Sequence, residues 1–317
     1  MQKLSISLAL DLYDHVQPLL DGSITADGLD LDIVTVWGGD RHDQMIAGKF
    51  DVAEFSLASY FVAFGKDESL SAIPVFPRRM FGHRYIYVNA NSGIASPQDL
   101  RGKKIGIKRY SNTLAFWFKG WLQHSYGIEL QAVHWFLWQP EVVDLDLPPG
   151  LSVTHIKKGA DLAKMLEEGE LDAVIFPEST EIMGVWRSSS PHVKRLFSDV
   201  RTVEREYFQT TGDFPIMHLI VGRKDLLEAE PWIARSLYEA FERAKQTWFK
   251  KMESPTFVSL AWSMIELEED RKLFGEARWP YGIEANRKSL ELMTQYAVEQ
   301  GLISAPVPVE KLFCFHE

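Results

Sequence analysis

The stretch of residues 48–60, GKFDVAEFSLASY, constrains the fold most strongly, because it places a buried strand directly before a helix. Residues 50–55 are apolar except for two acidic positions, one of them Glu54, which predicts a short strand. Ser56 then begins a helical pattern that brings Ser59 to the same face. Free backbone N–H groups and the helix dipole at such a point favour an anion. The stretch therefore predicts an anion-binding strand end, with helix capping by Ser56 as the alternative.

The same arrangement recurs twice further along the chain. Residues 165–180 again contain a helix end, a glycine suited to the position after a helix, an apolar strand and then Ser and Thr. Residues 103–113 form a third strand followed by hydroxyl side chains and a helical pattern. Strand ends of this kind in both halves predict an α/β fold with two lobes that face one cleft.

The length of 317 residues exceeds that of a usual single domain and predicts two. Strand-like segments near Tyr85 and Ile216 are predicted to carry the chain from one lobe to the other and back. The first lobe would then be discontinuous, formed by residues 1–83 and 216–317. Residues 84–215 would form the second, inserted lobe.

The composition argues against several classes of partner, and the first ten residues indicate the compartment. The net charge is −10 and there is no run rich in Lys or Arg, which argues against nucleic acid. No run approaches the ~18 apolar residues of a membrane span, so no membrane partner is expected. The single cysteine, Cys314, excludes an intrachain disulfide. Residues 1–10 are too short and polar for a signal peptide and begin with Met, which favours the cytoplasm. The sequence does not decide whether the protein forms a homo-oligomer.

Motifs along almost the whole chain resemble one family. They occur in order at residues 54–60, 73–79 with His83, 96–102, 214–218, 231–232, 240–241, 244–245, 279–282, 300–302 and 312–313. Taken together they resemble the 4,5-dihydroxyphthalate decarboxylase family, whose fold is that of the type II periplasmic binding proteins. The resemblance implies a lyase of aromatic compound catabolism. Its substrate would be a small hydroxylated aromatic carboxylic acid, dihydroxyphthalate-like, bound between the lobes.

The chain departs from the family pattern at three strand ends. Gly82-His83-Arg84 replaces an expected Arg-His-Ser, and Arg109 precedes Tyr110 where an acidic residue is expected. Glu178 lies near an expected basic residue. These departures indicate that the substrate differs from 4,5-dihydroxyphthalate itself.

Decarboxylation of an aromatic acid requires a held carboxylate, a proton for the ring carbon and the exclusion of water. Arg79, with Ser56 and Ser59, is the candidate carboxylate-binding group, since Arg suits planar bidentate geometry. A salt bridge is the alternative role for Arg79. Further substrate-binding candidates at predicted strand ends are Tyr13, Tyr110, Ser111 and Glu178.

Two histidines are candidates for the proton-transfer step. His83 and His218 lie beside the two predicted crossings, and histidine delivers protons near neutral pH. His83 is preferred, because a strand end is expected to be more open than the apolar run around His218. Glu54 would tune such a histidine or accept a hydrogen bond from a phenol. Structural roles are the alternatives for both histidines, and a charge at a helix N-terminus is the alternative for Glu54.

No cofactor is predicted, because a ring hydroxyl lets the aromatic ring act as its own electron sink. A divalent metal is the alternative. It would be held by residues distant in sequence, such as His83, His218 and Glu54, since no His-x-x-x-His or His-Glu-x-x-His spacing is present. A non-catalytic solute-binding protein for a small aromatic or carboxylate ligand is the alternative function, because fold alone does not decide chemistry.

Overall fold

The computed structural model describes residues 3–36, 39–67, 69–176, 190–254 and 256–316. The chain forms two compact units, and each unit is made of more than one stretch of sequence. The first unit comprises Met1–Arg79, His218–Thr294 and Pro306–Glu317, and the second comprises Met80–Met217 and Gln295–Ala305. The chain thus changes unit after Arg79 and after Met217, where the sequence-based boundaries lay after residues 83 and 215. Residues 295–305, assigned from sequence to the first lobe, group with the second unit.

The first unit contains a mixed five-stranded sheet in the order β2-β1-β3-β11-β4. Its strands are β1 (Leu4–Leu10), β2 (Leu29–Thr35), β3 (Val52–Ser56), β4 (Leu70–Arg79) and β11 (Ile216–Arg223). β1 runs parallel to β2 and β3, whereas β11 is antiparallel to β3. Every residue of β3 is buried, so the short strand expected from the apolar pattern lies at the centre of the sheet.

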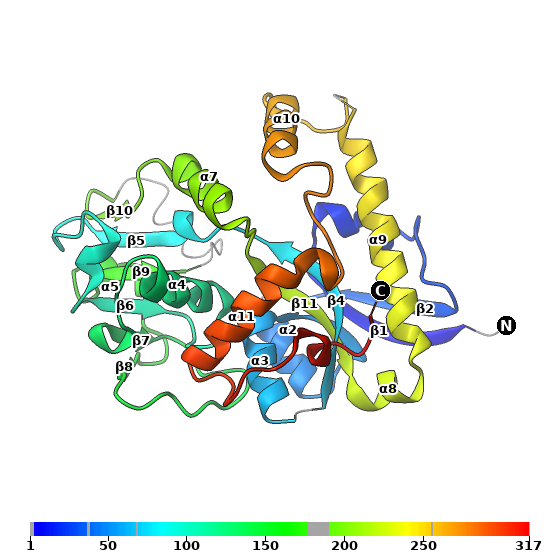
Figure 1. The fold of residues 1–317 in the computed structure, drawn as a ribbon, viewed down its shortest axis with the longest axis horizontal. Coiled ribbons are helices and arrows are strands. Elements are labelled where there is room, and N and C mark those ends of the chain that lie inside the picture. Colours follow the sequence, from blue (N-terminus) through cyan, green and yellow to red (C-terminus); the bar gives the residue numbers. More distant parts are fainter. Residues whose placement is uncertain (1–2, 37–38, 68, 177–189, 255, 317) are drawn as a thin grey trace. The chain divides into compact units, whose positions relative to one another are not determined.

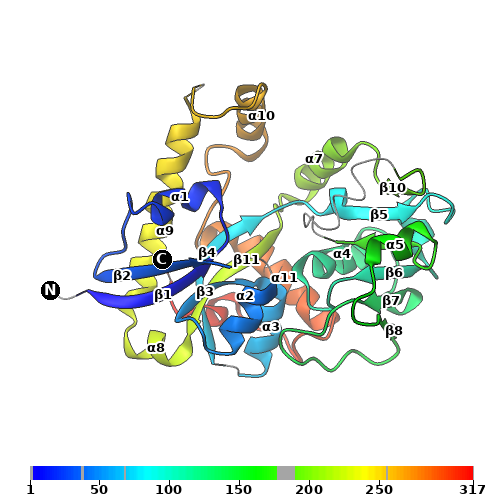
Figure 2. The same cartoon turned by 180° about the vertical axis from the view of Figure 1, so that it is seen from behind.

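Helices cover the sheet of the first unit (Figure 1, Figure 2). α9, the longest, packs on α1, on the 3-10 helix Asp14–Val16 and on β4, while α2 and α3 contact β3. The helices are α1 (Gln17–Leu20), α2 (Gly39–Ile46), α3 (Leu57–Gly65), α8 (Lys224–Ala229), α9 (Trp232–Met252) and α10 (Ser263–Phe274). α11 (Arg287–Glu299) begins in the first unit, and its last residues group with the second. Short 3-10 helices lie before and after α11, at Glu284–Asn286 and Val309–Leu312.

The second unit contains a mixed six-stranded sheet in the order β10-β5-β9-β6-β7-β8. Its strands are β5 (Ile86–Asn89), β6 (Lys104–Ile107), β7 (His134–Leu137), β8 (Ser152–His155), β9 (Ala173–Ile175) and β10 (Val193–Arg195). β5 is antiparallel to β9 and β10, and the remaining pairs are parallel. The helices are α4 (Thr113–His124), α5 (Leu162–Glu167) and α7 (Val200–Thr211), with 3-10 helices at His83–Tyr85, Pro97–Leu100 and Leu130–Ala132.

Two glycines predicted to follow helices do so in the left-handed backbone region. Gly48, after α2, has φ of 72°, and Gly169, after α5, has φ of 77°. Residues with a Cβ atom adopt this region at a cost, so glycine is favoured at both points. The helix–glycine–strand pattern expected from sequence is therefore confirmed in each unit. Among the described helices, none is both long enough and apolar enough to cross a membrane.

Candidate functional site

The pairing of β3 with β11 brings Glu54 and His218 together in the first unit. Ser56 pairs with His218 and Glu54 pairs with Ile220 across the two antiparallel strands. Directly paired residues share a face, and so do residues two apart along a strand, which makes Glu54 and His218 diagonal neighbours. The Nδ1 atom of His218 accordingly forms a hydrogen bond with Oε1 of Glu54.

The Glu54 carboxylate is fully buried and has four hydrogen-bonded or ionic partners. Besides His218, the Tyr13 hydroxyl donates to Oε1 at 2.6 Å and the backbone N–H of Asp11 donates to Oε2 at 3.0 Å. The guanidinium of Arg41 forms an ion pair with Oε1 at 3.0 Å. A buried charge is stable only when paired and hydrogen-bonded in this way.

Arg41 lies in α2 and has no exposed side-chain surface. Its Nε donates to the backbone carbonyl of Glu54 at 2.9 Å, and Nη1 donates to the carbonyl of Val36 at 2.7 Å. A second ion pair joins it to Asp11 at 3.0 Å. Arg41 therefore ties α2 and the end of β1 to the middle of β3 and fixes the position of the Glu54 carboxylate.

The charges of this cluster determine its protonation. Burial alone would raise the pKa of the Glu54 carboxyl, but Arg41, His218 and Tyr13 outweigh it and lower that pKa well below its usual range. Burial lowers the pKa of the His218 imidazole, and Glu54 offsets only part of that effect. Burial and the Glu54 charge raise the pKa of the Tyr13 hydroxyl. At neutral pH Glu54 is therefore ionised, while His218 and Tyr13 are neutral.

This protonation state fixes the tautomer of His218. A neutral imidazole whose Nδ1 faces a carboxylate carries its proton there, which leaves Nε2 as the proton-accepting atom. A carboxylate that orients an imidazole also stabilises the cation formed when Nε2 takes a proton. The Glu54–His218 pair is thus a buried group that can accept a proton at Nε2 and return it.

Aromatic rings extend from the pair toward the segment 279–282. The Tyr13 ring stacks on His15 with centroids 5.6 Å apart, and the His15 ring lies 5.1 Å from that of Trp279. On the other side, His42 of α2 meets His218 edge to face at 5.2 Å. These rings place aromatic surface beside the polar cluster, and a low local dielectric strengthens electrostatic interactions.

Arg79 is buried at the end of β4, where it anchors a turn. Its guanidinium donates to the carbonyl of Pro280 at 2.8 Å and to the side-chain oxygen of Asn286. Ser56 caps α3, since the Ser59 N–H donates to Ser56 Oγ at 3.4 Å. The carboxylate-binding role predicted for these three residues stays a prediction.

His83 lies in the second unit, and the expectation that it is more open than His218 is wrong. The exposed fraction is 2% for His83 and 8% for His218. The His83 ring stacks on Trp121 with centroids 4.4 Å apart, and the Phe197 and Tyr207 rings lie nearby. Burial lowers the pKa of His83 to about 4. The sequence showed the strand end but not the aromatic rings that cover it.

The remaining predicted residues also belong to the second unit. The Tyr110 hydroxyl donates to the carbonyl of Gln300 at 3.2 Å. The N–H and hydroxyl of Ser111 both donate to the carboxylate of Glu141. The anion expected at this strand end is thus a side chain of the protein itself. Glu178 lies outside the described residues. The alternative role of Glu54, a charge at a helix N-terminus, is wrong, because Glu54 lies within β3.

Sequence reasoning missed Arg41, His42 and Arg78. Arg41 and Met45 are four residues apart in α2, so they lie on one helix face, and both are buried. The signal available from the sequence was this spacing of an arginine and an apolar residue. Arg78 and Arg79 are successive strand residues, so their side chains leave opposite faces of β4. The Arg78 charge opposes protonation of His218 and favours ionisation of Tyr13. Arg78 is therefore within electrostatic reach of the Glu54–His218 pair.

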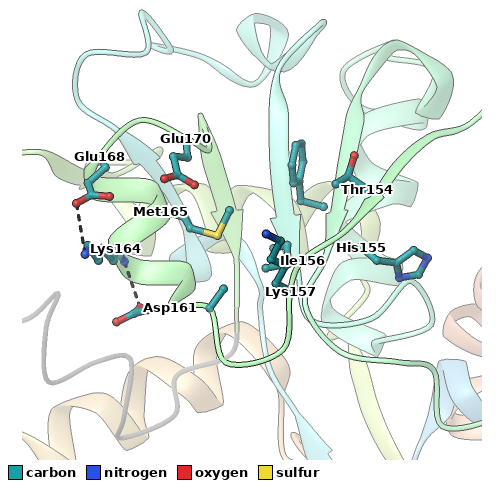
Figure 3. Close-up of a pocket in the computed structure, with 11 residues that line it drawn as sticks. Thr154, His155, Ile156, Lys157, Asp161, Lys164, Met165, Glu168 and Glu170 are labelled. Atoms are coloured by element: carbon teal, nitrogen blue, oxygen red, sulfur yellow. Dashed lines mark hydrogen bonds and ion pairs between the residues drawn. The ribbon is translucent and has the colours of Figure 1, made fainter.

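Neither a metal-binding cluster nor a second reaction site is evident among the described residues. In residues 3–36, 39–67, 69–176, 190–254 and 256–316, no three or more His, Cys, Asp or Glu side chains are arranged to hold a metal ion. A pocket of about 480 Å³ lies between β8 and α5 of the second unit (Figure 3). Its Lys164 and Glu168 are exposed and form an i,i+4 ion pair at 3.7 Å, as on an ordinary solvated helix.

Comparison with solved structures defines the class of fold. The chain matches the alkanesulfonate-binding protein SsuA from Xanthomonas axonopodis pv. citri bound to MOPS with a TM-score of 0.60, over 100% of both chains and at 10% identity. Together with the two mixed sheets, this match confirms the predicted type II periplasmic-binding-protein fold.

Sequence comparison gives the family. The chain is 32% identical to the 4,5-dihydroxyphthalate decarboxylase of Comamonas testosteroni, over 99% of this chain and 97% of that protein. The corresponding protein of Pseudomonas putida is 31% identical over 66% of this chain and 83% of its own length. A family profile described as NMT1/THI5 like matches residues 24–134. The chain belongs to the 4,5-dihydroxyphthalate decarboxylase family.

Proposed function

We propose that the protein is a carboxy-lyase that removes CO₂ from a small hydroxylated aromatic carboxylic acid. The observation that carries the proposal is the buried Glu54–His218 pair in a member of this family. The curated relatives are named for decarboxylation of 4,5-dihydroxyphthalate. That the substrate is an acid of the same class with different substituents stays a prediction from the departures at Gly82–Arg84, Arg109 and Glu178.

The reaction balances with one proton and no redox change. A ring hydroxyl para or ortho to the carboxylate releases its proton as the ring carbon that bears the carboxylate gains one. The bond between that carbon and the carboxylate then breaks and CO₂ leaves. Its electron pair restores the aromatic ring and leaves a phenolate oxygen, which takes back the proton that the hydroxyl released. A proton thus replaces CO₂ on the ring.

His218 carries the proton in this proposal and Glu54 orients it. The imidazole is neutral in the free protein, but a bound anion next to it raises the pKa of a histidine, so the proton arrives with the substrate. The Glu54 carboxylate stabilises the resulting imidazolium. General acid–base help of this kind contributes about 10²–10⁴-fold to a rate.

Arg78 is the cation that we assign to the substrate carboxylate. It is half-buried at the end of β4, and its charge acts on both Tyr13 and His218. Arg79, on the opposite face of β4, donates to Pro280 and Asn286. Arg78→Gln should therefore raise KM, whereas Arg79→Gln should lower stability by loosening the turn at residues 280–286.

The test separates turnover from binding. Purified protein is incubated with a panel of hydroxylated benzoates and phthalates while CO₂ release is followed, and binding of each acid is measured by calorimetry. We expect CO₂ from acids with a hydroxyl para or ortho to the carboxylate and none from the unsubstituted acids. Binding without CO₂ release across the panel would instead favour a solute-binding protein.

A further inference from the structure

Tyr281 is a buried tyrosine whose hydroxyl has no hydrogen-bond partner among the described residues. The side chain is 4% exposed, and the ammonium group of Lys245 lies 4.0 Å from the centre of its ring. Buried hydroxyl groups in native proteins are nearly always hydrogen-bonded, because an unpaired one destabilises the fold. An unpaired hydroxyl in such a place indicates a partner that comes from outside the chain.

The backbone around Tyr281 is held by hydrogen bonds on both sides. Lys245 donates to the carbonyl of Trp279 at 2.9 Å, and Arg79 donates to that of Pro280 at 2.8 Å. The N–H of Gly282 donates to the carbonyl of Pro74 in β4 at 2.8 Å. Two of these donors are buried charged side chains. The segment 279–282 is therefore rigid, and a rigid segment presents a hydroxyl in a fixed place.

The same segment is linked to the Glu54–His218 pair. Trp279 is in ring contact with His15, which stacks on Tyr13, and the Tyr13 hydroxyl donates to Glu54. The Glu54 charge also acts directly on the Tyr281 hydroxyl. Tyr281 thus belongs to the surround of the proposed reaction site, within the first unit.

We propose that the Tyr281 hydroxyl donates a hydrogen bond to a ring oxygen of the substrate, and so selects hydroxylated acids. The inference rests on the proposed function and names a specificity residue for it. A donor at that oxygen also stabilises the negative charge that the ring oxygen carries as CO₂ leaves.

The charges around the hydroxyl favour a ring oxygen over a carboxylate. Glu242, Asp14 and Glu54 act on it, Arg79 opposes them, and the nearby Lys245 is itself paired with Glu242 at 2.7 Å. A second carboxylate would be repelled there, whereas a neutral phenol oxygen would not. Burial raises the pKa of Tyr281 well above its usual value, so the hydroxyl stays protonated and remains a donor.

Tyr281→Phe tests the inference, because it removes one oxygen atom and keeps the ring. Tyr60→Phe is the matched control, since the Tyr60 hydroxyl is equally buried but donates to the carbonyl of Leu312 at 2.6 Å. Without ligand, we expect Tyr60→Phe to lower Tm and Tyr281→Phe to leave it unchanged or raise it. An equal loss in both variants would show that Tyr281 has a partner in the protein and would overturn the inference.

Binding is measured by calorimetry with two pairs of probes. These are 4,5-dihydroxyphthalate against phthalate, and 3,4-dihydroxybenzoate against benzoate. For Tyr281→Phe we expect about 10-fold weaker binding of the hydroxylated member only. The same loss for both members of a pair, or for neither, would overturn the inference while leaving the proposed function intact. If the unmodified protein neither binds nor decarboxylates any of these acids, the proposed function fails, and the ligand-free comparison of Tm still decides whether Tyr281 has a partner.

Discussion

Two buried histidines, one in each unit, differ in what surrounds the ring. His218 faces the ionised carboxylate of Glu54, which is itself held by Arg41 and Tyr13. His83 is stacked on Trp121, and its Nδ1 atom has no hydrogen-bond partner among the described residues. Both imidazoles are neutral at pH 7, yet only His218 has a group that stabilises its protonated form. Burial alone therefore makes a histidine inert, and a buried carboxylate beside it makes the ring useful for proton transfer.

The largest expected effect separates the two histidines by activity. His218→Gln keeps a side chain of similar length but cannot exchange a proton, so kcat should fall by about 10²–10⁴-fold with little change in KM. His83→Phe keeps a ring against Trp121 and should leave kcat unchanged. Steady-state CO₂ release checks both variants, and a kcat loss confined to the His83 variant would return the proton-donor role to His83.

Replacing the carboxylate of the first unit should cost more stability than replacing one in the second. Glu54→Gln leaves the buried Arg41 with Asp11 as its remaining acidic partner, so we expect a loss of about 3 kcal/mol in the free energy of unfolding. Glu141→Gln keeps an acceptor for the Ser111 donors and should cost less. Urea titration of both variants makes the comparison, and equal losses would mean that the ion pair with Arg41 adds little.

The two sites should also lose stability in different pH ranges, and His83 acts in the higher one. The folded pKa of His83 is lowered to about 4 from its ordinary value of 6.5, so between these values the unfolded chain binds a proton that the folded protein does not. Stability therefore falls as pH decreases from 6.5 to 4, by about 3 kcal/mol from this residue. His83→Phe should flatten that part of the curve.

Glu54 acts in a lower pH range. Its folded pKa is depressed, so its contribution is present above the unfolded value of 4.5 and is lost as pH falls further. The free energy of unfolding measured from pH 7 to 3 should thus fall first through the His83 range and then further below pH 4.5, where Glu54 contributes. An identical slope between pH 6.5 and 4 in His83→Phe and the unmodified protein would contradict the assignment.

The smallest expected difference concerns two tyrosines. The Tyr13 hydroxyl donates to a carboxylate at 2.6 Å, and the Tyr110 hydroxyl donates to a neutral carbonyl at 3.2 Å. Tyr13→Phe should cost about 1.5–3 kcal/mol and Tyr110→Phe about 0.5–1.5 kcal/mol, since bonds to charged groups are stronger. Chemical denaturation measures both, and the reverse order would show that Glu54 does not depend on Tyr13.

The sequence predicted local features of the site well. The strand that contains Glu54, the helix start at Ser56 and the glycines after two helices follow from apolar pattern and backbone preference, which act over a few residues. The family motifs extended this to the fold class. Glu54 was also named as a partner for a histidine, although nothing in the sequence said which one.

The rest depends on contacts between distant segments. Neither spacing nor composition reveals that Arg41 lies against Glu54, because that contact needs α2 to dock on β3. The sequence favours His83 over His218 because a strand end is expected to be open. The rings of Trp121 and Tyr207, which cover His83, come from helices distant in sequence and could not be foreseen. The sequence predicts that Ser111 belongs to an anion site, but it does not reveal that the anion is Glu141, which lies 30 residues further along.

The position of β11 has a consequence for how the protein is made. β11 lies between β3 and β4 in the first sheet, yet it is synthesised after almost all of the second unit. Glu54 and His218 are 164 positions apart, so the site forms only once this late strand is inserted. Until then β3 has an unpaired edge, and such edges attract other chains. A ribosome-stalled chain that ends before residue 216 should therefore need a chaperone to stay in solution.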